Sequence, residues 1–239
     1  MISIVIPTFN EAKEIRTTLR NLSELRHRGF EIILSDALST DRTVELAKPF
    51  ADKVVLETDP GLRTIARGRN LGAAAAEGEY LVFIDADIFI PHPLEFFRRA
   101  QADFEQNPKL VGLTVKLRVH PAEATWADRL VFGWVNFSHW LNNLIGLGSA
   151  SGEFQMIRTA VFRKIGGFQE KLAVAEDIVM FRNLAKLGQT RLDRSLTVFH
   201  HGRRAHAIGW PRTLWAWARN WLAVTFLHRS ADKEWTAIR

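Results

Sequence analysis

The strongest constraint on the fold is the regular return of short runs of branched apolar residues, separated by longer segments with helical spacing. The runs lie at 2–6, 32–34, 54–56, 81–84 and 110–117. Strands that alternate with helices form mostly parallel sheets that helices cover on both faces. The sequence therefore predicts an α/β fold with a doubly wound, mostly parallel sheet, and 239 residues are enough to build it as one domain.

The helices expected between these runs have recognisable starts. Asn10 is positioned to cap a helix over 11–26, and the polar segment 39–41 is positioned to open another at Thr43. Pro93 suits the first turn of a third helix. Beyond residue 117 the pattern predicts further elements. They are a long amphipathic helix from Trp126 to near Gly146, a loop over 146–152, a strand over 154–157, a helix over 176–187 and a last strand over 191–199.

Two carboxylates, Asp85 and Asp87, follow one buried run directly. Ligands of open α/β sheets bind at the carboxyl ends of the strands, so both acids are expected to face the crevice there. Mg²⁺ or Mn²⁺ commonly takes one or two protein carboxylates and completes its coordination with phosphate oxygens and water. The pair therefore predicts a cation site beside a phosphate group. An isolated Asp-x-Asp also fits a solvated turn at the end of a strand.

Asp36 ends the second apolar run, beside the residues 7–11 that end the first. Acids or small polar groups thus follow three strands and are expected at one edge of the sheet. Such an edge can read the base and ribose of a nucleotide by hydrogen bonds. Taken alone, Asp36 fits the capping of the following helix equally well.

Six short motifs occur along the chain in a fixed order. They are Ile-Pro-Thr-Phe-Asn-Glu at 6–11, Asp36 with Ser-Thr-Asp at 39–41, Ala-Arg-Gly-Arg-Asn-Leu-Gly at 66–72, Asp-Ala-Asp at 85–87, Gly-Gly-Phe at 166–168 and Glu-Asp at 176–177. In this order the chain resembles family 2 glycosyltransferases of the GT-A fold, over residues 1 to about 205. The resemblance implies an inverting transferase that uses a nucleotide-sugar donor, with Mn²⁺ or Mg²⁺ as cofactor.

The resemblance also implies roles for single residues. Those implied to contact the nucleotide sugar are Pro7, Thr8, Asn10, Glu11, Asp36, Arg69 and Asp85. Those expected on the acceptor side are Gly152, Gly167 and Glu176. The resemblance further implies that Asp36 reads the base, that Asp87 is the metal ligand and that Asp177 is the catalytic base. We therefore expect a catalytic domain over 1–205, with a donor half over 1–117 and an acceptor half over 118–205.

One departure from the family concerns the nucleotide base. Members commonly carry Asp-Asp-Gly-Ser after the second strand, whereas Asp36 is followed here by Ala-Leu-Ser. The second acid and the glycine are both missing. The base is therefore left open between two donors: a UDP-sugar is preferred, and a GDP-sugar is the alternative.

The acid pair Glu176 and Asp177 has a chemical reason independent of the family. An acceptor hydroxyl has a high pKa, so its attack on a sugar needs a general base, and a carboxylate at a helix start beside a cleft can serve. Adjacent acids point in different directions, so at most one faces the cleft and the other is expected to interact with the positive end of the helix. The alternative is that both only stabilise the helix.

The segment His-His-Gly-Arg-Arg at 200–204 follows the last predicted strand. A neutral imidazole can complete the coordination of the cation, and the guanidinium groups of Arg203 and Arg204 match phosphate oxygens. Side chains alternate along a strand, so only one of His200 and His201 is expected to face inward, and we favour His201. The alternative is a pair of surface histidines and a solvated turn.

The C-terminal end is basic and rich in tryptophan. From residue 194 onward eight Lys and Arg face two acids, which equals the whole net charge of +6, and all eight Trp lie at or after Trp126. Residues 206–239 are therefore expected to form a helical tail beginning near Pro211. Its apolar and arginine-bearing faces fit three arrangements: packing on its own domain, dimerisation, or a membrane surface.

The sequence predicts no membrane-spanning helix. The best candidate, 208–227, contains Arg212 and Arg219, which are costly at the centre of a bilayer. Met1 leads directly into the first apolar run without a leader of the signal-peptide type. We therefore expect a cytoplasmic protein, peripheral on the cytoplasmic membrane face if its tail binds lipid. The absence of cysteine excludes a disulfide framework and a thiolate metal site.

Three functions compete at this point. The first is a metal-dependent inverting glycosyltransferase acting on a hydroxyl or phosphate of a membrane-associated acceptor, such as a polyprenyl phosphate or a lipid-linked glycan. The second is a sugar nucleotidyltransferase, which needs a glycine-rich basic loop where the chain has Pro-Thr-Phe-Asn at 7–10. The third is a nucleic-acid-binding protein that uses the basic tail. Acids at three strand ends oppose the third, so no nucleic-acid partner is expected.

Overall fold

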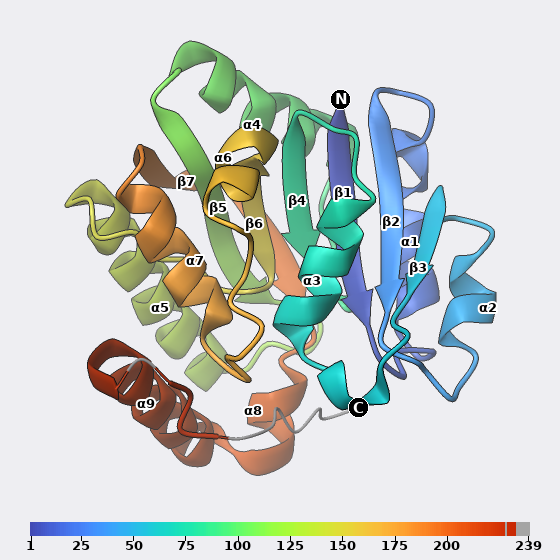
Figure 1. The fold of residues 1–239 in the computed structure, drawn as a ribbon. Helices are drawn as coiled ribbons and strands as arrows, with labels where there is room; N and C mark the ends of the chain where they lie inside the picture. The colour runs from blue at the N-terminus through green and yellow to red at the C-terminus, as the bar shows by residue number, and fades with distance from the viewer. Residues whose placement is uncertain (228, 233–239) are drawn as a thin grey trace.

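A seven-stranded sheet lies at the centre of the computed structural model, which describes residues 1–227 and 229–232 (Figure 1). The strands are β1 (Ile2–Thr8), β2 (Phe30–Asp36), β3 (Lys53–Leu56), β4 (Tyr80–Ile84), β5 (Leu110–Val119), β6 (Phe154–Arg158) and β7 (Gln189–His200). Their spatial order is β3-β2-β1-β4-β6-β5-β7. β1 runs parallel to its neighbours β2 and β4, β2 runs parallel to β3, and β5 runs parallel to β7. β6 is antiparallel to both of its neighbours, β4 and β5. The prediction of a mostly parallel sheet is confirmed.

Helices cover both faces of the sheet. They are α1 (Ile15–Leu22), α2 (Thr43–Ala47), α3 (Ile65–Ala74), α4 (Pro93–Gln106), α5 (Trp126–Leu144), α6 (Thr159–Lys164), α7 (Glu176–Ala185), α8 (Arg203–Ile208) and α9 (Trp210–Leu227). One core joins the sheet to α1, α2, α4 and α5, and a second core joins the other face to α3, α6 and α7. Figure 1 shows α3, α6 and α7 together in front of the strands.

The continuous apolar runs follow from this double cover. Successive side chains of a strand point to opposite faces, so a strand buried on both faces is apolar at every position. In β1, Ile4 and Ile6 lie in the first core and Val5 in the second. In β4, Val82 packs on the first side and Phe83 on the second.

The first helix differs from the prediction. It begins at Ile15 rather than at residue 11, and a short 3-10 helix ends it at Leu25. Asn10 adopts a left-handed conformation with φ 56°, and its side-chain oxygen accepts a hydrogen bond from the Thr40 amide. Asn10 therefore joins the loops after β1 and β2 instead of capping a helix, because its side chain is already engaged across the sheet edge.

The later helices agree closely with the pattern. α4 begins at Pro93, α5 begins at Trp126, and α9 covers the expected tail helix. Thr125 and Asp128 form a capping box at the start of α5, which the sequence analysis had not identified. The expected boundary between residues 205 and 206 falls inside α8, and α8 packs against α9. Among the described residues, no helix combines the length and apolar character that crossing a bilayer demands.

Candidate functional site

The loops after β1 and β2 meet at the carboxyl edge of the sheet. Thr8 and Asp36 are register partners at the ends of the two strands. Asp36 is buried, and its carboxylate accepts hydrogen bonds from the Thr8 hydroxyl at 2.9 Å and from the Ser39 amide at 2.8 Å. The start of α2 is held by another acid, since Asp41 accepts from the Thr43 amide at 3.0 Å. Asp36 therefore fixes the loop at this edge and does not cap α2, and its reading of a base stays a prediction.

Arg69 of α3 lies at the centre of a buried polar cluster. One guanidinium nitrogen, Nη1, donates to Glu176 Oε1 at 2.6 Å. The other, Nη2, donates to Asp85 Oδ1 at 3.2 Å and to the Gly152 carbonyl at 3.0 Å. The guanidinium also lies over the Phe168 ring, 5.2 Å from its centroid. Only 1% of the Arg69 side chain is exposed, so this cation joins the end of β4 to the start of α7 from within the protein.

Four acids surround this one arginine. Burial raises the pKa of the Glu153 carboxyl to about 8, and the charges of Asp85 and Asp177 add to the rise. Burial likewise raises the pKa of Glu176 to about 7, with Asp177 adding to the rise and Arg69 opposing it. The pKa values of Asp85 and Asp177 are also raised by burial, against the effect of Arg69. The cluster is therefore short of positive charge.

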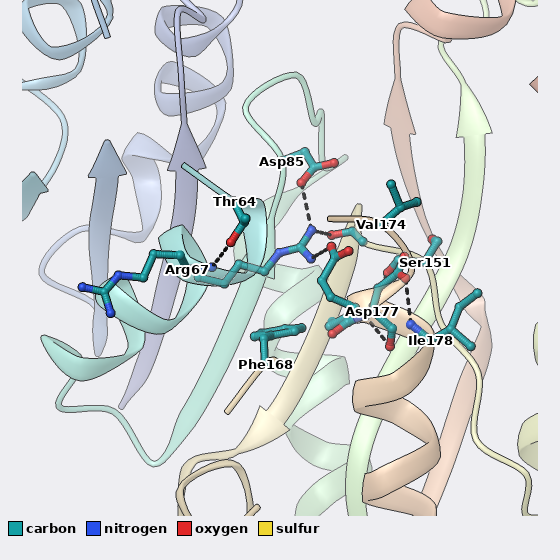
Figure 2. Close-up of polar contacts among 12 residues, drawn as sticks. Thr64, Arg67, Asp85, Ser151, Phe168, Val174, Asp177 and Ile178 are labelled. Carbon is teal, nitrogen blue, oxygen red and sulfur yellow. Dashed lines mark hydrogen bonds and ion pairs between the residues drawn. The ribbon is translucent and has the colours of Figure 1, made fainter. Parts of the chain in front are cut away.

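Glu176 and Asp177 differ in their surroundings. Glu176 is buried against Arg69, a partner that the sequence did not indicate. Asp177 is half-buried, and its carboxylate accepts a hydrogen bond from the Ile178 amide at 2.7 Å. Figure 2 shows Asp177 beside Ser151, across the cluster from Asp85. Of the two acids, Asp177 is thus the one with access to solvent, as a general base requires.

A second arginine binds the other aspartate of the β4 end. Arg203, at the start of α8, donates from Nε to Asp87 Oδ2 at 3.0 Å and from Nη1 to Glu11 Oε2 at 3.0 Å. Burial by itself would lower the pKa of Arg203, but the charges of Asp87 and Glu11 raise it. About a quarter of its side chain, 24%, is exposed. Each aspartate of the motif therefore pairs with a different arginine: Asp85 with the buried Arg69, and Asp87 with the partly exposed Arg203.

Comparison with known proteins identifies the family. The model described as glycosyl transferase family 2 matches residues 3–166. The chain belongs to this family. An uncharacterised glycosyltransferase of Haemophilus influenzae is 30% identical over 185 residues, and the alignment covers 74% of this chain. This chain spans 59% of the length of that relative.

Solved structures show the GT-A fold that the resemblance implied. A mannosyltransferase from Pyrobaculum calidifontis, in complex with GDP-Man and Mn²⁺, superposes with a TM-score of 0.67 at 20% identity, over 84% of this chain and 56% of the other. Glucosyl-3-phosphoglycerate synthase from Mycobacterium tuberculosis, in complex with Mn²⁺, UDP and glucosyl-3-phosphoglycerate, gives a TM-score of 0.64 at 21% identity, over 95% and 79%. At these identities the likeness establishes the fold.

The residues of this family 2 chain fit a divalent cation at the Asp87 side of the site. Asp87 and Glu11 come from two neighbouring strand ends and share one guanidinium, so two carboxylates already hold a positive charge between them. No group of three or more possible ligands occurs among the described side chains. Mg²⁺ and Mn²⁺ need only one or two carboxylates when a diphosphate supplies further oxygens. The donor set therefore suits a cation that arrives with its substrate.

The orientation of the two histidines at the end of β7 differs from the prediction, which favoured His201 as the inward one. Both ring nitrogens of His201 lie beside surface acids, at 2.8 Å from Glu123 and 3.3 Å from Glu14. His200 packs its ring against Phe132, and its Nε2 is buried without a hydrogen-bond partner among the described residues. Burial lowers the pKa of His200 to about 4, so its ring is neutral at physiological pH. The structure thus favours His200 over His201 as the inward histidine.

The last four predicted site residues are Gly152, Gly167, Pro7 and Arg204. A Cβ at Gly152 would lie 2.6 Å from Arg69 Nη2, and one at Gly167, where φ is +80°, would lie 2.6 Å from Asn70 Oδ1. Both glycines therefore let loops approach α3 closely. Pro7 is half-buried beside α3. Arg204 is half-buried, and burial lowers its pKa while the charge of Asp232 opposes that effect.

Sequence reasoning missed Glu153. It belongs to no motif, but it is the single Asp, Glu, Lys or Arg between residues 130 and 157. An isolated charge between a glycine and an apolar strand is the signal that could have found it. Arg67 was also missed as an ion-pair residue; its Nε donates to the buried Glu57 carboxylate at 2.8 Å.

Proposed function

We propose that this protein transfers a sugar, with inversion, from a nucleotide-sugar donor to a hydroxyl or phosphate group of a membrane-associated acceptor. A UDP-sugar is the preferred donor, and a GDP-sugar is the second choice. The observation that carries the proposal is the bridge made by Arg69. It joins Asp85, on the donor side, to Glu176, the residue immediately before Asp177. Arg69 thereby holds Asp85 and the start of α7, which carries the candidate base, around one buried guanidinium.

Different groups of site residues would support different parts of the reaction. Asp87 and Glu11, with His200 as a further candidate, would hold the divalent cation. When bound, the cation would neutralise the charge that develops on the diphosphate as its bond to the sugar breaks. Thr8, Asn10 and Asp36 organise the loops against which we place the nucleoside.

Asp177 would accept the proton of an acceptor hydroxyl. A carboxylate with a raised pKa is a stronger base, and burial raises the pKa of Asp177. If the acceptor group is a phosphate, its oxygen is already ionised and the base becomes less necessary. The acceptor proposed here includes polyprenyl phosphates and lipid-linked glycans, which differ in this respect.

The test is turnover of a panel of nucleotide sugars by the purified protein, with and without Mn²⁺, followed by release of the nucleoside diphosphate. We expect release from a UDP-sugar that depends on the metal and increases with a lipid-linked acceptor. The exposed α4 variant Glu105→Gln serves as a matched acid-to-amide control and should behave as wild type. No turnover of any donor, with acceptors of both chemical types present, would refute the proposal.

A further inference from the structure

Helix α5 presents a continuous apolar stripe to solvent. Large exposed side chains recur on its outer face, at helical spacing, along its whole length. They are Trp126, Leu130, Trp134, Phe137, Leu141 and Leu144. Trp134 is 66% exposed and Leu130 is 64% exposed. The opposite face holds the buried Phe132 and Asn143 and packs against the protein. The helix is therefore apolar on its solvent-facing side as well as on its packed side.

Helix α9 repeats this arrangement. Its inner side carries the buried Thr213, Asn220 and Val224. Its outer side carries a second group of exposed apolar side chains. They are Leu214, Trp215, Trp221, Leu222 and Phe226. Figure 1 shows α5 and α9 at the left and lower left of the molecule, away from β3 and α2 on the right. We call these two groups of exposed side chains together the apolar surface.

The exposed charges on the two helices are all positive. Arg129 on α5 and Arg212 on α9 are exposed. The one acid within either helix, Asp128, is 1% exposed and turned inward. Exposed arginine beside tryptophan and leucine is the composition of helices that lie in the interface of a bilayer, where the rings reach headgroup depth and the guanidinium groups meet lipid phosphates.

We infer that the outer faces of α5 and α9 together form a surface that docks on an anionic lipid bilayer. The inference extends the proposed function, because it states where the membrane lies relative to the donor site. It assigns part of the binding to α5, which lies within the expected catalytic domain, and not to the basic tail alone.

A second copy of the chain is a less suitable occupant. A two-fold symmetric interface places the same patch against itself. Such an interface would enclose the exposed Arg129 and Arg212 of both copies, with no exposed acid on either helix to compensate them. An anionic bilayer attracts both arginines at once. The charge pattern therefore selects lipid over self-association.

The apolar surface is connected to the donor site through one carboxylate. Asp128 of α5 lies 3.0 Å from His206 Nε2 of α8 and accepts a hydrogen bond from Trp210 Nε1 of α9 at 2.9 Å. α8 in turn begins at Arg203, which contacts Asp87. A bilayer against α5 and α9 would thus lie beside the edge of the sheet at which a lipid-anchored acceptor must arrive.

The test is co-sedimentation with vesicles, using the full chain. Wild type should bind phosphatidylglycerol–phosphatidylcholine vesicles more tightly than phosphatidylcholine vesicles, and its tryptophan emission should shift to the blue and be quenched by brominated lipid. Leu130→Ser and Trp134→Ser should each weaken binding by about tenfold, since each removes a large apolar side chain from the contact. Arg129→Gln should reduce the preference for the anionic vesicles and leave a smaller salt dependence.

Leu56→Ser is the matched control, because Leu56 is 51% exposed on β3, at the far edge of the sheet. It should bind vesicles as wild type does. Equal binding by wild type, Leu130→Ser and Trp134→Ser would overturn the inference, and so would a dimer in light scattering that Leu130→Ser dissociates while vesicles bind neither form. Donor hydrolysis in vesicle-free solution reports on the proposed function separately. If hydrolysis persists while vesicle binding fails, only the docking surface is refuted.

Discussion

Arg69 and Arg203 both bind an aspartate of the Asp85–Asp87 motif, yet they are built into the protein in different ways. Arg69 projects from α3, is 1% exposed, and also binds Glu176 and the Gly152 carbonyl. Arg203 projects from α8 near the C-terminal end, is 24% exposed, and also binds Glu11. One motif therefore has a permanent internal cation on one side and an accessible cation on the other.

The difference in burial predicts different roles for the two arginines: Arg69 stabilises the fold, and Arg203 occupies a place that a ligand cation can take. Breaking a buried ion pair leaves an uncompensated charge in a poorly solvated place, which is strongly destabilising. An ion pair with access to water contributes little, because solvent replaces the lost partner. Arg69 should therefore hold the fold together, whereas the place of Arg203 between Asp87 and Glu11 is one that another cation can take.

The largest expected effect is that of removing Arg69. Arg69→Ala leaves Glu176 and Asp85 without their shared partner, so we expect the free energy of unfolding to fall by about 3–5 kcal/mol. Arg203→Ala should cost no more than about 1 kcal/mol, since its pairs are partly solvated. Urea denaturation of both variants measures the contrast. Equal losses of unfolding free energy would show that burial does not distinguish the ion pairs of the two arginines.

The next effect concerns activity on the Arg69 side. Asp177→Asn should lower turnover with a hydroxyl acceptor by about 10²–10⁴-fold, the usual contribution of a general base. It should not destabilise the fold, because it removes one charge from a cluster with too many acids. Steady-state kinetics and thermal unfolding of the same variant are the measurements. Near-normal turnover would exclude the general-base role, or would indicate a phosphate acceptor.

A smaller effect is expected on the Arg203 side, for metal binding without donor. Arg203→Gln removes the guanidinium that a cation has to displace from Asp87 and Glu11. Mn²⁺ should then bind about two- to fivefold more tightly, the equivalent of one partly solvated ion pair. Electron paramagnetic resonance of free Mn²⁺ measures this, with Asp87→Asn as the variant that should lose binding. Weaker binding by Arg203→Gln would mean that Arg203 assists the cation instead of competing with it.

The last prediction is a pH dependence of stability with opposite signs in the two regions. The pKa of Glu153 rises from 4.5 to about 8, so the folded protein binds more protons than the unfolded chain between these values, and stability falls as the pH rises through them. The pKa of His200 falls from 6.5 to about 4, so stability is lost there as the pH falls.

Two variants separate these contributions. Glu153→Gln should remove the loss of stability that accompanies a rise in pH from 4.5 to about 8. His200→Gln should remove the opposite change, the loss that accompanies a fall in pH from 6.5 to about 4. Denaturation midpoints over a pH series measure both profiles. If Glu153→Gln leaves the profile between about pH 6.5 and 8 unchanged, the excess of acids around Arg69 is not the cause of the loss there.

The sequence predicted the features that local rules control. Continuous apolar runs identified the buried strands, and the position of Asp85 and Asp87 after one of them placed both acids at the carboxyl edge. Pro93 and Trp126 begin helices as expected, because the fixed φ of proline suits a first turn and the helical spacing of apolar residues starts at Trp126.

What the sequence did not predict depends on contacts between distant segments. Arg69 and Glu176 are 107 residues apart, and only the folded sheet brings α3 to the start of α7. The orientation of His200 follows from packing against Phe132, which periodicity along β7 cannot specify. Asn10 resembles a helix cap in sequence, but the Thr40 amide lies close enough to take its side chain.

The buried carboxylate of Asp128 has a mechanical consequence. It is hydrogen-bonded to the Thr125 amide, to Trp210 and to His206, and so fastens the first turn of α5 to both C-terminal helices. Movement of α5 relative to α8 or α9 would have to break these hydrogen bonds, and α8 begins at Arg203, which contacts Asp87.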